Sequence, residues 1–314
     1  MTLAIIGAGM AGLSCASQLR KAGLSPVVFE KSRGTGGRLA TRRSVYGGFD
    51  HGAQFVTARD AGFKAYLDHA AGLGRAAHWV DPASGDESWW TGTPGMSGLV
   101  KPMLEGLDVR TGQRVAQMRR EGPGWVLSLE TSEEQTFDTV LLAVPVVQAL
   151  DLLAGHAAAF PGLESVDIAP CWTGMFVFDE ALPISLSVIQ RAGDIAWAAR
   201  ETARPQREGD AERWVVQASA DWSRRYLEET PEAIRPLLLK QFRAAAGVIL
   251  PEPAHADVHR WRYAKVERPL GQVCLWDGAL KLGLAGDWCL AARVEAAFLS
   301  GRALADAVVT ASAS

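Results

Sequence analysis

The chain has 314 residues and a formal net charge of −3, and its 48% hydrophobic and 21% charged residues are typical of a soluble globular protein with two domains. No basic tract stands out, so the composition argues against nucleic acid and anionic membranes as partners. No apolar run reaches the roughly 18 residues of a membrane span, and the first residues lead directly into an apolar segment without a signal peptide, so we expect a cytoplasmic protein.

The first 30 residues have the order of a βαβ dinucleotide-binding unit. An apolar segment of strand length, Leu3–Ile6, precedes a G-x-G-x-x-G motif at Gly7–Gly12. Apolar residues three apart then predict a helix that ends at Gly23, and a second strand-like run, Pro26–Phe29, leads to Glu30. This order predicts an α/β class protein with a Rossmann-like domain.

The residue types in this unit fit the chemistry of a dinucleotide. Gly7 allows a tight turn, and Gly12 lets the helix pack closely on the strand. Gly9 lets backbone N–H groups approach a pyrophosphate at the helix N-terminus, where the helix dipole favours negative charge. Glu30 is placed to accept hydrogen bonds from a ribose diol. We therefore expect the cofactor to contact Gly7, Gly9, Met10, Ala11, Gly12 and Glu30.

A second glycine-rich, basic segment follows the acid directly, at Ser32–Arg38. An NAD site has no need of such a segment, whereas FAD is longer and its diphosphate needs neutralising from a second side. The alternatives are a basic loop that binds nothing and a loop that reads the 2′-phosphate of NADP through Lys31 and Arg33. Glu30 argues against that phosphate by like-charge repulsion. The favoured cofactor is FAD, with Lys31 and Arg38 among its ligands.

The middle of the chain alternates between helical and strand-like patterns. A helix is expected from Phe63 to Ala70, and a turn that opens a helix at Thr93–Val100, with Ser97 as its N-cap. Asp108–Met118 is expected to be one strand region, followed by strands at Trp125–Glu130 and Thr136–Val144. Short strand-like runs and helices at Asp221–Glu229 and Pro231–Ala246 then predict a mostly antiparallel sheet with a helical cover over residues 146–264.

One face of this second sheet has two interpretations. Trp172, Gly174, Phe176 and Phe178 share a face by strand alternation, and that face is either core or a pocket wall.

The C-terminal segment has a strand at Ala279–Leu284, a Gly286-Asp287 turn and a helix that runs to Ala307. The four cysteines form no C-x-x-C pair, and the six histidines show no metal spacing, so we expect reduced thiols and no metal. No attachment motif is present, so the FAD should be non-covalent, and the role of Cys289 stays open.

Several of these segments together resemble the bacterial renalase-like FAD oxidases of the flavin amine oxidase superfamily. The resemblance rests on Gly7–Gly12, Ser32–Arg38, Asp50–Arg59, Pro94–Ser97, His259–Ala264, Gly286–Leu290 and Arg293–Glu295, and it spans nearly the whole chain. One departure is Ala296, which stands where the family usually has glycine.

The resemblance implies roles for individual residues. Gln54 and Phe55 would lie near the isoalloxazine ring and Val115 near the adenine. Asp287 would accept a hydrogen bond from the ribityl chain, and the helix N-terminus near Val294 would face flavin N1 and O2. On the substrate side, it points to Thr57, Arg59, Met96, Trp288 and Arg293.

It also implies an architecture and a reaction. The Rossmann-like FAD-binding domain would be of the glutathione reductase or p-hydroxybenzoate hydroxylase type, made of residues 1–60, 94–145 and 265–314, with residues 61–93 and 146–264 as the substrate domain. The enzyme would oxidise 2- or 6-dihydro isomers of NAD(P) to NAD(P)+ by hydride transfer to flavin N5, and O2 would become hydrogen peroxide. The alternatives are a flavin amine oxidase and a non-catalytic dinucleotide-binding sensor.

Overall fold

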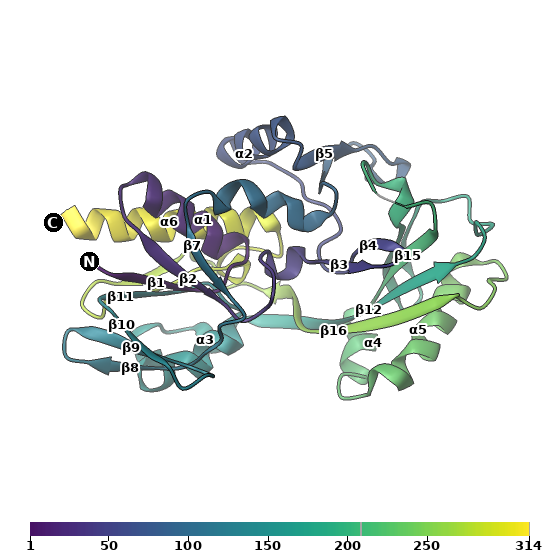
Figure 1. Ribbon diagram of the computed structural model, residues 1–314. Helices are drawn as coiled ribbons and strands as arrows, with labels where there is room; N and C mark the ends of the chain where they lie inside the picture. The colour runs from purple at the N-terminus through teal and green to yellow at the C-terminus, as the bar shows by residue number, and fades with distance from the viewer. Residues whose placement is uncertain (208, 314) are drawn as a thin grey trace.

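The computed structural model describes residues 1–207 and 209–313 and divides them between two main sheets (Figure 1). The first has six strands in the order β17-β18-β11-β1-β2-β7, all parallel to their neighbours except β17. The strands are β1 Leu3–Ile6, β2 Pro26–Glu30, β7 Asp108–Thr111, β11 Thr139–Leu142, β17 Leu275–Asp277 and β18 Leu282–Leu284. The chain continues from β1 to β2 on one side and returns later as β11 on the other side, so the strand order reverses next to β1. Doubly wound sheets bind nucleotides at this topological switch point.

Both faces of this sheet are covered. Helices α1 (Met10–Lys21) and α6 (Val294–Ala313) pack together on one face. The sheet β10-β9-β8 and helix α3 (Val146–Leu153) lie on the other, with β8 Val115–Glu121, β9 Gly124–Leu129 and β10 Glu134–Phe137. Alternate residues of β1 enter different cores, Leu3 and Ile5 one, Ala4 and Ile6 the other. That double burial explains why the strand is apolar without interruption.

The second main sheet is antiparallel, in the order β13-β14-β15-β12-β16. Its strands are β12 Asp167–Phe178, β13 Val188–Ala192, β14 Ile195–Arg200, β15 Glu212–Ala218 and β16 His255–Arg268, and helices α4 (Ala220–Arg225) and α5 (Pro231–Ala246) cover it. Trp172, Phe176 and Phe178 are buried in the core with Leu238 and Phe242 of α5. Of the two interpretations of that strand face, the structure therefore selects core.

Two hairpins and a helix between β2 and β7 in the sequence belong to neither main sheet. These are β3 (Thr41–Ser44) with β4 (Gly47–Asp50), β5 (Ala76–Trp79) with β6 (Trp89–Gly92), and α2 (Ala61–Gly72). The long strands β12 and β16 extend from the second sheet to the nucleotide-binding half (Figure 1). The division into two discontinuous domains stays a prediction.

Four expectations about elements are wrong. The single strand over Thr136–Val144 is divided between β10 and β11, which belong to different sheets. The single strand over Asp108–Met118 is two strands in different sheets, because the chain turns at Gly112, whose φ is +70°. Gly95, not Ser97, is the N-cap of the 3-10 helix Met96–Leu104, and the N–H of Ser97 donates to Thr41 Oγ1 at 3.2 Å. Helix α6 continues past Ala307 to Ala313. Among the described residues, none of the helices is both long and apolar enough to cross a bilayer.

Candidate active site

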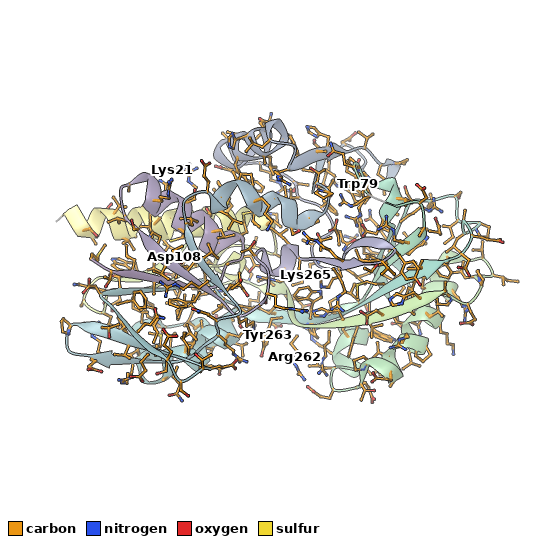
Figure 2. The ribbon with its side chains drawn as sticks, viewed as in Figure 1. Lys21, Trp79, Asp108, Arg262, Tyr263 and Lys265 are labelled. Atoms are coloured by element: carbon orange, nitrogen blue, oxygen red, sulfur yellow. The ribbon has the colours of Figure 1, made fainter. Side chains whose placement is uncertain are left out.

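A large cavity of about 2060 Å³ lies between the glycine-rich edge of the six-stranded sheet and the second sheet. Its walls come from the β1–α1 turn, the Lys31–Arg43 segment, the loop 51–57, strand β16 and the start of α6. Figure 2 shows Tyr263 and Lys265 of β16, two of its lining residues, where the two halves meet. The volume exceeds the roughly 300–1,000 Å³ of ordinary small-molecule pockets, so a dinucleotide and a second molecule have room together.

The three glycines of the first motif are needed for different reasons. A Cβ on Gly12 would lie 1.9 Å from the carbonyl oxygen of Gly7, and one on Gly7, whose φ is +107°, would lie 2.5 Å from that of Ala143. A Cβ on Gly9 would meet no protein atom within 4 Å, and Gly9 lines the cavity. The protein itself therefore does not require a glycine at position 9, whereas a pyrophosphate at the N-terminus of α1 does.

The second glycine-rich segment crosses the first. The N–H of Gly36 donates to the carbonyl of Ala8 at 2.8 Å, and Gly9 and Gly36 form a parallel bridge. Gly36 has φ +110° and Gly37 φ +55°, so the crossing depends on backbone conformations that glycine adopts freely. The two predicted diphosphate segments thus share one edge of the cavity.

Glu30 ends β2 with 6% of its surface exposed. Its carboxylate accepts hydrogen bonds from the N–H groups of Ala8 and Ser32 at 2.9 and 2.8 Å. A carboxylate has about four acceptor positions, and Glu30 also lines the cavity, so it can still accept from a ribose.

Arg38 and Asp287 meet in a two-pronged ion pair, with nitrogen–oxygen distances of 2.8 and 2.6 Å. Arg38 also donates to the carbonyl of Ala264 at 3.1 Å, and both members of the pair line the cavity. The predicted diphosphate and ribityl contacts are therefore linked to each other. Val115, which was predicted to lie near the adenine, and Lys31 also line the cavity, and burial lowers the pKa of Lys31.

The Asp50–Phe55 loop forms another wall. The ring of Phe55 stacks on Trp89 with centroids 4.2 Å apart and lies beside Trp197. Gln54 lines the cavity, and both the nitrogen and the oxygen of its amide already form hydrogen bonds within the protein. Nε2 donates to the carbonyls of Asp50 and Gly52 at 2.6 and 2.9 Å, and Oε1 accepts from Arg204 at 2.5 Å.

The structure brings together four of the five predicted substrate residues. Thr57, Arg59, Trp288 and Arg293 line the cavity, whereas Met96 is fully buried outside it. The sulfur of Met96 accepts the N–H of Gly92 at 3.3 Å. Met96 is thus a core residue in this structure, and its role toward the substrate stays a prediction.

Glu295, 1% exposed, fixes this side of the cavity. Its Oε1 accepts the N–H groups of Arg59 and Asp60 at 2.6 and 2.7 Å, and its Oε2 lies 2.9 Å from Arg293. The contacts tie the loop before α2 to the start of α6, where Val294 and Ala297 line the cavity.

Ala296 and Cys289 are both buried outside the cavity lining. The extra methyl group of Ala296 therefore packs in the protein. Burial raises the pKa of the Cys289 thiol to about 12, so this cysteine is an unreactive core residue.

His51 and His259, for which no role was predicted, lie together on the cavity wall. Their rings are 4.9 Å apart, and Trp261 lies 5.2 and 4.4 Å from them. Desolvation lowers both pKa values to about 4, and Arg42, 3.3 Å from His259 Nδ1, contributes to both shifts. Both rings are neutral near pH 7. Each histidine lies in a segment that carries the family resemblance, and this was the only feature of the sequence that pointed to a functional role for them.

Comparisons with known proteins agree with this geometry. The model of the NAD(P)-binding Rossmann-like domain matches residues 5–70, and that of flavin containing amine oxidoreductase matches residues 76–309. The chain belongs to the flavin containing amine oxidoreductase family. It is 24% identical over 305 residues to renalase of Mus musculus, covering 86% of this chain and 88% of that protein.

Solved structures share the fold. A protein from Exiguobacterium sp. 255-15 assigned as a protoporphyrinogen oxidase superposes with a TM-score of 0.79 at 14% identity, covering 98% of both chains. A redesigned putrescine oxidase superposes with a TM-score of 0.72 at 14% identity, covering 99% of this chain and 100% of that one. The prediction of a Rossmann-like domain with a second, mostly antiparallel sheet is confirmed.

Family membership makes the chain a flavin-dependent oxidoreductase, and the residues present fit such a cofactor. The open space at Gly9, the free N-terminus of α1 and the carboxylate of Glu30 suit the dinucleotide end. The aromatic wall at Phe55 and the N-terminus of α6 suit a flat ring. The individual ligand assignments remain predictions.

Proposed function

We propose that this protein binds FAD without a covalent bond and oxidises 2- or 6-dihydro isomers of NAD(P) to NAD(P)+. Bound FAD would supply the hydride acceptor and would return the electrons to O2, so that substrate, O2 and one proton yield NAD(P)+ and hydrogen peroxide. The nicotinamide specificity comes from the family resemblance, and the charge of the cavity supports it.

The observation that carries the proposal is the excess of positive charge around the cavity. The chain as a whole is acidic, with 32 Lys and Arg against 35 Asp and Glu, yet thirteen basic and only five acidic side chains line the cavity. The basic ones are Lys31, Arg33, Arg38, Arg42, Arg43, Arg59, Lys101, Arg114, Arg191, Arg260, Arg262, Lys265 and Arg293. The acidic ones are Glu30, Glu87, Asp151, Glu267 and Asp287.

Eleven of these thirteen cations fall into two groups, and the other two, Arg59 and Arg293, lie beside Glu295. Lys31, Arg33, Arg38, Lys101 and Arg114 surround the glycine-rich segments, where they suit the cofactor diphosphate. A second group comes from β3, β13 and β16: Arg42, Arg43, Arg191, Arg260, Arg262 and Lys265. Within this group Arg42 is paired with Asp257, and Arg260 and Arg262 are paired with Glu228. A second diphosphate on the substrate would give a partner to Arg43, Arg191 and Lys265, which form no ion pair among the described residues, whereas an amine cation would be repelled.

The protein's own part in the reaction would be binding and orientation. Loss of hydride from a dihydropyridine gives an aromatic pyridinium, so no proton has to be removed from the substrate carbon. The neutral rings of His51 and His259 fit that requirement, because they offer polar contacts without a base of high pKa. Phe55, Trp197 and Trp261 would shield the reacting rings from water.

The test uses the purified flavoprotein under anaerobic conditions. Mixing with 6-dihydro-NAD should bleach the flavin absorbance rapidly, and air should restore it with formation of peroxide. Rapid bleaching by amines instead would favour the amine oxidase, and tight flavin binding without bleaching by either would favour the sensor.

A charge variant sharpens this test. Lys265→Gln should raise the KM for the dinucleotide about tenfold and weaken its salt dependence, because Lys265, unlike Arg260 and Arg262, has no ion-pair partner among the described residues. The matched control is Arg75→Gln, an exposed arginine outside the cavity. An equal effect of both variants would contradict the assignment of the second group to the substrate.

A further inference from the structure

A cluster of four charged residues lies immediately behind the Asp50–Phe55 loop. Asp50, Glu201, Arg204 and Arg207 have side chains that are at most 2% exposed. Arg204 Nη1 lies 3.8 Å from Asp50, and its Nε lies 3.7 Å from Glu201. Arg207 pairs with both carboxylates, and its Nε lies 3.4 Å from Glu201. Of the four, none lines the cavity, and the proposed reaction uses none of them.

Arg204 holds Gln54 with both prongs of its guanidinium. One nitrogen donates to the backbone carbonyl of Gln54, and the other donates to the side-chain Oε1 at 2.5 Å. Gln54 Nε2 in turn donates to the carbonyls of Asp50 and Gly52. The side chain of Gln54 therefore links the two ends of the loop, and Arg204, from the second half of the molecule, holds Gln54 in this position.

The two carboxylates anchor the cluster to neighbouring segments. Asp50 Oδ1 accepts from Thr41 Oγ1 at 2.6 Å and from the N–H of Met96 at 2.8 Å. Glu201 accepts the N–H of Asp50 at 3.1 Å, and Arg207 donates to the carbonyl of Gly92 at 2.9 Å. The loop is thus held at one position relative to β3, β6 and the 3-10 helix at Met96.

Stability alone does not explain such a cluster. Removing four charges from water is costly, and well-packed apolar side chains at buried ion-pair sites are often as stable or more so. What apolar side chains cannot supply is a set of directed hydrogen bonds to backbone carbonyls. The cluster therefore supplies geometry to the loop that carries Gln54 and Phe55.

We propose that Arg204 is a positioning residue, which holds Gln54 and so fixes the Asp50–Phe55 loop in the shape that receives the flavin ring. In this arrangement Gln54 stabilises the loop conformation, because the nitrogen and the oxygen of its amide form their hydrogen bonds within the protein. The surface offered to the cofactor is then the loop backbone and the ring of Phe55.

The proposal is tested with Arg204→Lys, which keeps the charge and loses the two-pronged contact. The matched control is Arg200→Lys. Arg200 also donates to a carboxylate and a carbonyl, Glu212 at 3.0 Å and Ile184 at 2.9 Å, but it lies outside the cavity lining. The readouts are the flavin dissociation constant, the positions of the visible absorption bands of the bound flavin, and the denaturant midpoint of the apoprotein.

Arg204→Lys should weaken flavin binding about tenfold or more and shift the absorption bands, while Arg200→Lys leaves both unchanged. Wild-type affinity and spectrum in a folded Arg204→Lys protein would overturn the proposal, even if the midpoint falls. If that variant does not fold, the double change Glu201→Gln with Arg204→Gln keeps the cluster neutral and is judged by the same readouts.

The proposed positioning role of Arg204 concerns flavin binding and does not depend on which substrate the enzyme oxidises. A wild-type protein that binds flavin but leaves dihydronicotinamides unoxidised would refute the proposed function and leave these measurements valid. A wild-type protein that binds no flavin would refute both.

Discussion

Replacing each glycine of the first motif by alanine separates the needs of the fold from the needs of the cofactor. Gly9 has φ −80° and ψ −174°, a conformation that alanine adopts freely, and its added Cβ would touch no protein atom within 4 Å. Gly9→Ala should therefore leave the free energy of unfolding of the apoprotein unchanged or raise it by about 0.4–1 kcal/mol, since the unfolded chain loses freedom.

Gly12→Ala should behave in the opposite way. Its Cβ would lie 1.9 Å from the carbonyl oxygen of Gly7, which is backbone and cannot turn aside as a side chain can. Moving α1 away from β1 to relieve this contact should cost about 3 kcal/mol in the free energy of unfolding. The destabilisation should be visible without any cofactor.

The assay is urea unfolding of each apoprotein, followed by titration with flavin. Gly9→Ala should be stable yet bind flavin at least tenfold more weakly, because the new methyl group occupies the path of the pyrophosphate. Normal flavin affinity in Gly9→Ala would refute the placement of the pyrophosphate. A loss of apoprotein stability as large as that of Gly12→Ala would refute the packing argument.

Three further predictions follow from the site. The pKa of His51 is about 4 in the folded protein, below its ordinary value of 6.5, so the unfolded chain binds more protons between these two pH values. The free energy of unfolding should therefore fall by up to about 3 kcal/mol as the pH drops from 6.5 to 4. Urea unfolding curves measured over this pH range should show a smaller fall for His51→Asn. Arg38→Ala leaves Asp287 buried without its partner and should lower the free energy of unfolding by about 2 kcal/mol and weaken flavin binding, while Arg119→Ala, which removes a surface pair, should change neither. Cys289 should resist alkylation at pH 8 until denaturant is added, and denaturation should release intact flavin into the supernatant; mass spectrometry that finds flavin attached to the chain would contradict a non-covalent cofactor.

The cofactor end of the site could be predicted because its residues are close in sequence. Leu3–Glu30 forms one βαβ unit, and strand length, glycine spacing and the acid are all local patterns. Where such patterns were weaker the sequence was a poorer guide to the structure. The family resemblance pointed to Met96 on the substrate side, but nothing local showed that its sulfur accepts the N–H of Gly92 in the core. Likewise, no pattern separated β7 from β8, which only the turn at Gly112 assigns to different sheets.

The proposed substrate side of the cavity, and the charged cluster at Arg204, could not be predicted in the same way, because they form only when distant segments meet. His51, in the loop after β4, meets His259 of β16, where Trp261 Nε1 donates to the carbonyl of His51 at 2.8 Å, and Arg204 reaches Gln54 across 150 residues of sequence. Each of these side chains alone fits a surface or a core position equally well. It follows that proteins sharing this fold can keep the same glycine motifs and still differ in substrate. The charge around β3, β13 and β16 is therefore a better guide to what this protein oxidises than the motifs are.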